Sequence, residues 1–199
     1  MIPKIEFVYS RVYDKRYREN KNIQKILKKR EQKYPSEKKI KNYIKRAEKE
    51  WKKQGRKILA EMSKIMSLKW KEEKIKCYII GSGRSFSDPL TVKLSKNLSD
   101  FINTLTHEMI HQLQTQNIKR MKKWWNYVYR KYKKEPELTK NHILLHSVHK
   151  KLYLKIFNKN RLKRNIKRDD TKPDYEHSWE IVEREGYENI IERFHKITR

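Results

Sequence analysis

The longest regular pattern of hydrophobic positions in the chain lies between residues 36 and 65. Its hydrophobic residues follow one another at steps of three, four or seven: Ile40, Ile44, Ala47, Trp51, Ile58, Met62 and Ile65. This spacing places them on one face of an α-helix, with Gly55 as the one weak point. Ser36 is a suitable N-cap, and Glu37 is favourable in the first turn. The pattern predicts one long helix laid across the core; a partner-binding or coiled-coil arm is the alternative.

Two later segments alternate between hydrophobic and polar residues, which is typical of half-buried β-strands. The alternating positions are Ile75, Cys77 and Ile79 in the first segment and Leu90, Val92 and Leu94 in the second. Between them lies GSGRSFSDP (residues 81–89), which lacks the third glycine and the following helix of a phosphate-binding loop. We therefore expect a β-hairpin whose connection is this segment. Residues 5–10 fit either a short strand or the start of a helix.

Helical patterns fill most of the remaining chain. We expect helices over residues 22–30, 95–117, 118–134, 142–157, 175–185 and 187–197, and a charged loop over residues 158–174. Asn97 or Ser99 is the expected cap of the second of these helices, and Thr139 or Asn141 that of the fourth. Gly186 separates the last two helices.

These elements predict an α+β protein that is predominantly helical. Only 4 Gly and 5 Pro occur in 199 residues, which argues against a many-stranded β protein. We expect a short β-hairpin packed on the helix over residues 95–117, with additional helices around it. Residues 1–74 would be an N-terminal helical region packed on or extending from a core formed by residues 75–199.

The candidate chemistry lies in the helix over residues 95–117. His107-Glu108-Met109-Ile110-His111 matches the H-E-x-x-H pattern, and residues four apart share one face of a helix. Imidazole suits Zn²⁺, and a catalytic zinc site has three protein ligands with water in the fourth position. Bound zinc lowers the pKa of that water to about 7, and Glu108 is placed to accept its proton. We expect His107 and His111 as zinc ligands and Glu108 as the catalytic base; a chance histidine pair on a solvated helix face is the alternative.

The alternating strand and the capped helix that contains THEMIHQL (residues 106–113) resemble the minimal core of zincin metallopeptidases, most of all SprT-type proteases. The resemblance covers residues 75–157. It implies a zinc peptidase with a zincin-like core, in which an edge strand, here residues 90–95, holds a protein or peptide substrate in extended form. SprT-type proteins are often linked to DNA, which implies substrates associated with nucleic acid.

The third metal ligand is open to several candidates. His142, His146 and His149 share one hydrophobic face of the helix over residues 142–157, where a buried histidine needs a hydrogen-bond partner or a metal. The third ligand of SprT-type proteases follows the motif closely in a His-Gly context, whereas these histidines come more than thirty residues later. We expect His146, because it lies deep in the helix and His146-Ser147 is nearest to that context. The alternatives are His149, His142 and the carboxylates of Glu176 and Glu180.

The charge of the chain points to a partner. Lys and Arg number 52 against 24 Asp and Glu, which gives a formal net charge of +28. Such a field attracts polyanions, so nucleic acid is an expected partner of the basic surface. The alternative is that the positive charge reflects a proteome that is rich in Lys as a whole. Residues 118–134 interleave basic and aromatic side chains, as single-stranded nucleic-acid sites do. Trp125 falls on the hydrophobic stripe of that segment, whereas Trp124 and Tyr127 lie off it and are the expected stacking residues.

The sequence also indicates a compartment. The single cysteine, Cys77, excludes an internal disulfide framework and fits a reducing environment. No hydrophobic run is long enough to span a bilayer, and the first residues lack the hydrophobic core of a signal peptide. We expect a cytoplasmic zinc metallopeptidase that has no membrane partner. The alternatives are a basic nucleic-acid-binding helical protein with a structural or vestigial zinc site, and a toxin-like or other zinc hydrolase that acts on a non-peptide bond.

Overall fold

The computed structural model of the protein describes residues 1–169 and 173–199. Within these residues the fold is α+β and predominantly helical, as the sequence predicts. The chain forms two compact units, the first made of residues 1–56 and 72–112 and the second of residues 57–71 and 113–199. These units divide the chain differently from the expected regions 1–74 and 75–199, because the N-terminal strand pairs with the strand that begins at Lys74.

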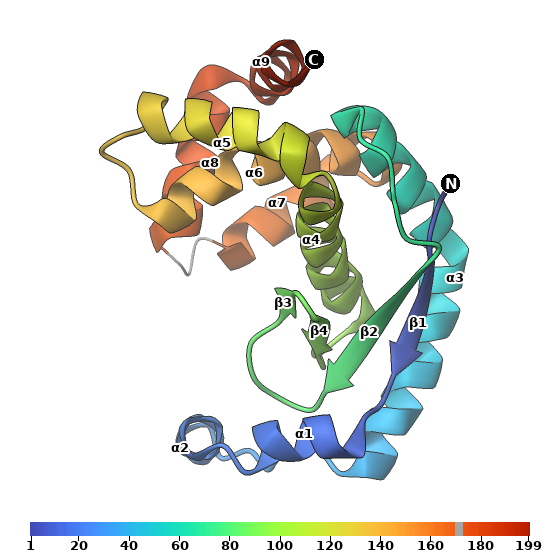
Figure 1. The fold of residues 1–199 in the computed structure, drawn as a ribbon. Coiled ribbons are helices and arrows are strands. Elements are labelled where there is room, and N and C mark those ends of the chain that lie inside the picture. The colour runs from blue at the N-terminus through green and yellow to red at the C-terminus, as the bar shows by residue number, and fades with distance from the viewer. Residues whose placement is uncertain (170–172) are drawn as a thin grey trace. The chain divides into compact units, whose positions relative to one another are not determined.

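The first unit contains a four-stranded sheet with the order β1-β2-β4-β3 (Figure 1). Its strands are β1 (Lys4–Val8), β2 (Lys74–Ile80), β3 (Phe86–Ser87) and β4 (Leu90–Lys93). β1 and β4 both pair with β2 in parallel, and β3 pairs with β4 in antiparallel fashion.

The expected hairpin between β2 and β4 is therefore wrong. Residues 81–89 contain the two-residue strand β3, so the chain reverses twice before β4 and β4 runs in the same direction as β2. The antiparallel pair is the much shorter one between β3 and β4, with Ser87 opposite Leu90. The alternating pattern identifies both longer strands but carries no information about their relative direction.

Four helices begin in the first unit: α1 (Arg11–Arg18), α2 (Lys21–Lys29), α3 (Glu37–Met66) and α4 (Leu98–Gln116). The long helix α3 starts as expected, with the side chain of Ser36 accepting a hydrogen bond from the backbone N–H of Lys39. Its hydrophobic face is buried, since Ile40, Ala47 and Ile58 are fully inaccessible. This confirms the interpretation of α3 as a core helix.

Gly55 has a packing role in α3. A Cβ atom at this position would collide with the indole ring of Trp51, so the ring occupies the space that any larger residue would need. Trp51 is itself 6% exposed. The glycine that weakens the helix locally thus allows a large aromatic side chain to fold onto its surface.

The second unit contains α5 (Ile118–Lys131), α6 (Glu137–Ile156), α7 (Lys159–Asp169), α8 (Pro173–Glu185) and α9 (Tyr187–Thr198). Helix α6 packs against both α8 and α9. Gly186, with φ +80°, separates the last two helices as expected. None of the described helices is both long and hydrophobic enough to span a bilayer.

Two expectations for this unit are corrected. Helix α6 begins at Glu137 directly after Pro136, two or more residues before the expected caps Thr139 and Asn141, because proline supplies the fixed φ of a helix start. The expected loop over residues 158–174 is helix α7 as far as Asp169, and residues 170–172 of that prediction lie outside the described residues. The side chain of Asn158 caps α7 by accepting a hydrogen bond from the N–H of Arg161.

Candidate metal centre

Helix α4 positions the His107–His111 motif on the sheet of the first unit. The helix begins at the cap Asn97, whose side-chain oxygen accepts a hydrogen bond from the N–H of Asp100 at 2.8 Å. Phe101 is fully buried against the ring of Phe7 on β1 and that of Tyr43 on α3, with ring centroids 6.0 and 5.6 Å apart. The apolar side of α4 is thus fixed in the core, and the residues that follow are held in a defined orientation.

The two histidines of the motif lie side by side. Their ring centroids are 5.2 Å apart, as the one-turn separation on α4 requires. His107 is 7% exposed and His111 is half-buried. Both imidazoles are therefore largely removed from water, which favours binding of a metal ion by the neutral rings.

Glu108 lies between them in sequence and is also 7% exposed. Burial first, and the nearby Glu108 carboxylate second, raise the pKa of the Cys77 thiol on β2 well above its usual range. Cys77 is fully buried, so at neutral pH it is a thiol and not the thiolate that binds metals or attacks substrates. The ionisable chemistry on this side of α4 therefore rests on the carboxylate and the imidazoles.

Helix α6 carries three further histidines, each in a different environment. His142 contacts the ring of Tyr175 at a centroid distance of 4.3 Å. His146 is fully buried and stacks on Trp179, with ring centroids 4.2 Å apart and planes 7° from parallel. His149 meets Tyr153 edge to face at 4.3 Å.

The tautomer of His142 follows from its hydrogen bond. Its Nδ1 lies 2.7 Å from the carbonyl oxygen of Leu138, and a carbonyl oxygen only accepts. In the neutral ring, Nδ1 therefore carries the proton and Nε2 carries the lone pair. Metal-binding histidines are commonly oriented in this way, with one nitrogen donating to a backbone carbonyl and the other directed to the metal.

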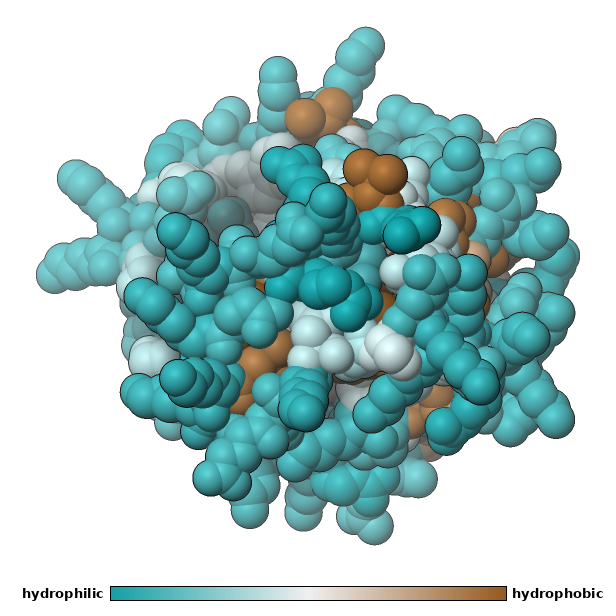
Figure 2. Space-filling view, turned by 90° about the horizontal axis from the view of Figure 1, so that it is seen from below, coloured by the Kyte–Doolittle hydropathy of each residue, from teal (hydrophilic) through white to brown (hydrophobic). Residues whose placement is uncertain are grey.

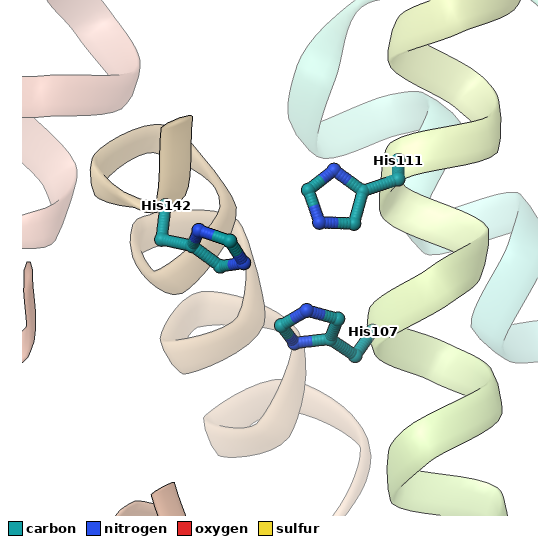
Figure 3. Close-up of side chains that lie close together, drawn as sticks. All are labelled: His107, His111 and His142. Carbon is teal, nitrogen blue, oxygen red and sulfur yellow. The ribbon is translucent and has the colours of Figure 1, made fainter. Parts of the chain in front are cut away.

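Three of these side chains form a group that could hold a metal ion. One ring nitrogen from each of His107, His111 and His142 lies within 4.8 Å of the other two (Figure 3). In this group of three histidines, His142 stands in the place expected for His146, whose ring is stacked on Trp179. His149 and the two candidate carboxylates, exposed Glu176 and exposed Glu180, do not belong to this group.

Comparison with known proteins adds no relative. No protein-family model, curated protein or solved structure matches the chain. The function is therefore inferred from the geometry of the site and from the motif itself.

The strand expected to hold an extended substrate is also placed differently. β4 is an inner strand, because β3 covers its outer side and the side chain of Ser85 accepts a hydrogen bond from the N–H of Lys93. The outer strand near α4 is β3, and Gln112, the residue after His111, donates a hydrogen bond to the carbonyl oxygen of Ser87. The sequence gives no sign of this contact, since β3 is only two residues long.

The two tryptophans of the basic aromatic segment, residues 118–134, are placed differently from the expectation. Trp124, expected to be available for stacking, is 2% exposed and packs edge to face on Phe194 of α9. Trp125, expected in the core, is half-buried. Tyr127 is half-buried beside the Trp124 ring. The spacing of hydrophobic residues within α5 alone therefore does not predict which side of this helix α9 covers.

Proposed function

We propose that this protein is a zinc-dependent hydrolase, with His107, His111 and His142 as metal ligands and Glu108 as the catalytic base. The observation that carries the proposal is the group of three histidine nitrogens within 4.8 Å of one another, with a buried glutamate next to the first of them. The proposed ligand set differs from the sequence expectation in the third ligand, which is His142 and not His146.

The dimensions of the group suit zinc. Three atoms that are at most 4.8 Å apart always have a common point within about 2.8 Å of each, and a Zn–N bond is about 2.0–2.1 Å long. Each nitrogen thus needs to approach by less than about 1 Å, which side-chain rotation supplies. Three imidazoles with no thiolate are also a ligand set that zinc accepts readily.

The number of ligands supports a catalytic role. Within the described part of the chain, the group consists of three histidines, and three protein ligands leave one coordination position of a tetrahedral zinc for water. Bound zinc would supply an activated water at neutral pH. Glu108 would accept the proton of that water and pass it to the leaving group, and its burial keeps competing bulk water away from the carboxylate.

Within this proposal the scissile bond is a peptide bond, and the protein is a metallopeptidase with a zincin-like core, similar to SprT-type proteases. The support is the position of β3: Gln112 ties this outer strand to the turn of α4 that carries His111. A polypeptide that pairs with the outer edge of β3 would pass alongside the metal ligands. Residues 86–87 therefore take the substrate-holding role that the resemblance assigned to residues 90–95.

The charge and the cysteine define the setting that we propose. The formal net charge of +28 favours substrates associated with nucleic acid, bound through Lys and Arg side chains. A reducing, cytoplasmic location fits the single buried thiol of Cys77. The alternative function, nucleic-acid binding with a structural zinc, requires a fourth protein ligand on the metal.

Reconstitution with zinc tests the proposal. The purified chain is stripped with a chelator, and cleavage of an unfolded protein substrate is measured before and after addition of one equivalent of zinc. We expect no cleavage by the stripped protein and restored cleavage by the zinc-loaded protein. Zinc binding without cleavage of a peptide substrate contradicts the peptidase, and cleavage that persists without metal contradicts the whole site.

A further inference from the structure

A cavity of about 850 Å³ lies in the first unit, apart from the histidine pair and Glu108 of the proposed active site. It is bordered by α1, α2, the segment after β2 and the end of β4. We call it the basic cavity, after its cationic lining residues Arg16, Arg30, Arg84 and Lys93. Its volume is in the range of cavities that bind small molecules.

The position of the basic cavity in the sheet is one where ligands commonly bind. β1, β2 and β4 are parallel, so their carboxyl ends meet at one edge of the sheet. Ser82, Gly83 and Arg84 follow the end of β2, and Lys93 is the last residue of β4. In open sheets with parallel strands, ligand sites lie outside the carboxyl ends of the strands. The position of the cavity at the carboxyl ends of the strands is thus a reason to expect a ligand that does not rely on the charge of its lining.

The positive charge of the cavity lining favours an anionic ligand. Among the described residues that line it, four are cationic and none carries a carboxylate. The guanidinium groups of Arg16, Arg30 and Arg84 have no ion pair within the part of the chain that the structure describes. Arginine presents paired N–H donors that match a phosphate group. Three such groups around one cavity indicate a phosphate-bearing ligand.

The remaining lining residues indicate that the ligand also has an aromatic or apolar body. Tyr13, Tyr17, Ile23 and Phe86 contribute rings and a branched side chain to the walls. Figure 2 shows the face that carries α1 and α2: hydrophilic side chains cover most of it, and hydrophobic ones are visible only in small separate areas. An apolar wall framed by cations suits a planar base attached to a phosphate.

The wall formed by the tyrosines is preorganised. The hydroxyl of Thr91 donates to the carbonyl oxygen of Pro89 at 2.8 Å, so the hydroxyl of Tyr13, at 2.9 Å, donates to that of Thr91. The hydroxyl of Tyr17 donates in turn to that of Tyr13 at 3.2 Å. Gly83 has φ +136°, and a Cβ there would lie 2.9 Å from the Tyr17 ring, so the segment after β2 approaches the wall closely.

The carboxylate of Asp14 holds helix α1 in place beneath this wall. Asp14 is 1% exposed and accepts hydrogen bonds from the hydroxyl of Tyr34 at 2.6 Å and from the N–H of Gly81 at 3.1 Å. Arg18, which does not line the cavity, donates to the same carboxylate at 3.0 Å. The cavity is thus bounded by a fixed framework and not by mobile side chains alone.

We propose that the basic cavity binds a nucleoside phosphate, with the phosphate held by Arg16, Arg30 and Arg84 and the base against the tyrosine wall. The nucleotide is either free or the 5′-phosphorylated end of a nucleic-acid strand, since both present the same chemistry. This site contains none of the proposed zinc ligands and its nucleotide binding does not depend on them, although Phe86 of its wall belongs to β3, the strand proposed to hold the substrate.

Calorimetric titration with AMP tests the proposal in buffer of physiological ionic strength, where diffuse attraction between exposed charges is weak. We expect saturable 1:1 binding by AMP and much weaker binding by adenosine. Arg84→Ala and Arg16→Ala should each weaken AMP binding by about tenfold or more, the loss expected for a charge-assisted hydrogen bond. The matched control Arg11→Ala removes an equal charge from exposed α1 surface outside the cavity and should change affinity by less than about twofold.

A second titration distinguishes the two sources. A 5′-phosphorylated trinucleotide that binds more tightly than AMP assigns the site to strand ends, and the reverse order assigns it to free nucleotides. The proposal is overturned if AMP does not bind, if both cavity variants bind AMP as the Arg11 variant does, or if an unphosphorylated trinucleotide binds equally well. The last result would mean that the diffuse positive field of the surface, and not a phosphate site in the cavity, accounts for the binding.

Discussion

The Nδ1 of His142 donates a hydrogen bond to the carbonyl oxygen of Leu138, one turn earlier on α6, at 2.7 Å. This bond fixes the tautomer in which Nε2 carries the lone pair, and Nε2 is therefore the atom that would bind zinc in the proposed site. His146, one turn later on the same helix, has its ring stacked on Trp179. The two residues therefore have different surroundings, although both lie on the same hydrophobic face in the sequence pattern.

Replacing each of these histidines by phenylalanine separates the two roles. Both variants keep a buried aromatic ring in α6 and carry a similar overpacking cost. We expect His142→Phe to weaken zinc binding by more than about 100-fold, because a metal ligand is lost, and His146→Phe to change it by less than about tenfold. Competition with a chromogenic chelator measures both affinities. The opposite order would restore His146 as the third ligand.

Removal of zinc should lower thermal stability. A ligand that binds only the folded chain at 100 times its Kd stabilises it by about 2.7 kcal/mol, which corresponds to a Tm change of about 5–10 °C in a chain of this size. Differential scanning calorimetry with and without chelator measures the shift. Glu108→Gln should show the same shift as the wild type, whereas equal Tm values with and without zinc would mean that no specific site forms.

The long helix α3 offers a test of the core assignment. Ile40 is fully buried and Ile44, one turn later on the same stripe, is half-buried. Ile40→Ala should lower the free energy of unfolding by about 2–4 kcal/mol, and the control Ile44→Ala by clearly less. Urea denaturation measures both values. Equal small losses would favour the alternative in which α3 is an arm.

His177 provides a pH-dependent contribution to stability. The carboxylates of Glu180 and Glu135, at 2.8 and 2.6 Å from its two ring nitrogens, raise the pKa of His177 above its usual range. A raised folded-state pKa stabilises the fold below the unfolded pKa of about 6.5, and this contribution is lost as the pH rises through the folded value. The side chain is 42% exposed, so solvent screening keeps the effect below about 1 kcal/mol. His177→Gln should flatten the unfolding free energy between pH 6 and pH 8, and an unchanged slope would exclude this ion pair as its source.

The sequence predicts much of the fold because local periodicity reports which residues face the core. The stripe from Ile40 to Ile65 predicts α3, and the alternation from Ile75 to Ile79 predicts β2. The direction of β4 is not predictable in this way, because the two reversals within residues 81–89 depend on the two-residue strand β3. Helix α7 is missed because its composition is almost entirely charged or polar.

The candidate metal site also has a part that local sequence spacing predicts and a part that it does not. His107 and His111 follow from their spacing on one helix, and no long-range information is needed. The third ligand requires a choice among three histidines on one face of α6. That choice depends on the Leu138 carbonyl and the Trp179 ring, which are tertiary and backbone features invisible in the pattern.

The most direct test of the central claim, that Glu108 activates a zinc-bound water, is the cleavage rate of zinc-loaded Glu108→Gln beside that of the wild type. Glutamine keeps the size and hydrogen bonding of the side chain but does not accept a proton at neutral pH. We predict one zinc per chain in both proteins, unchanged folding by circular dichroism, and a loss of several orders of magnitude in kcat for the variant. A Glu108→Gln protein that retains its zinc and cleaves as fast as the wild type would contradict this claim.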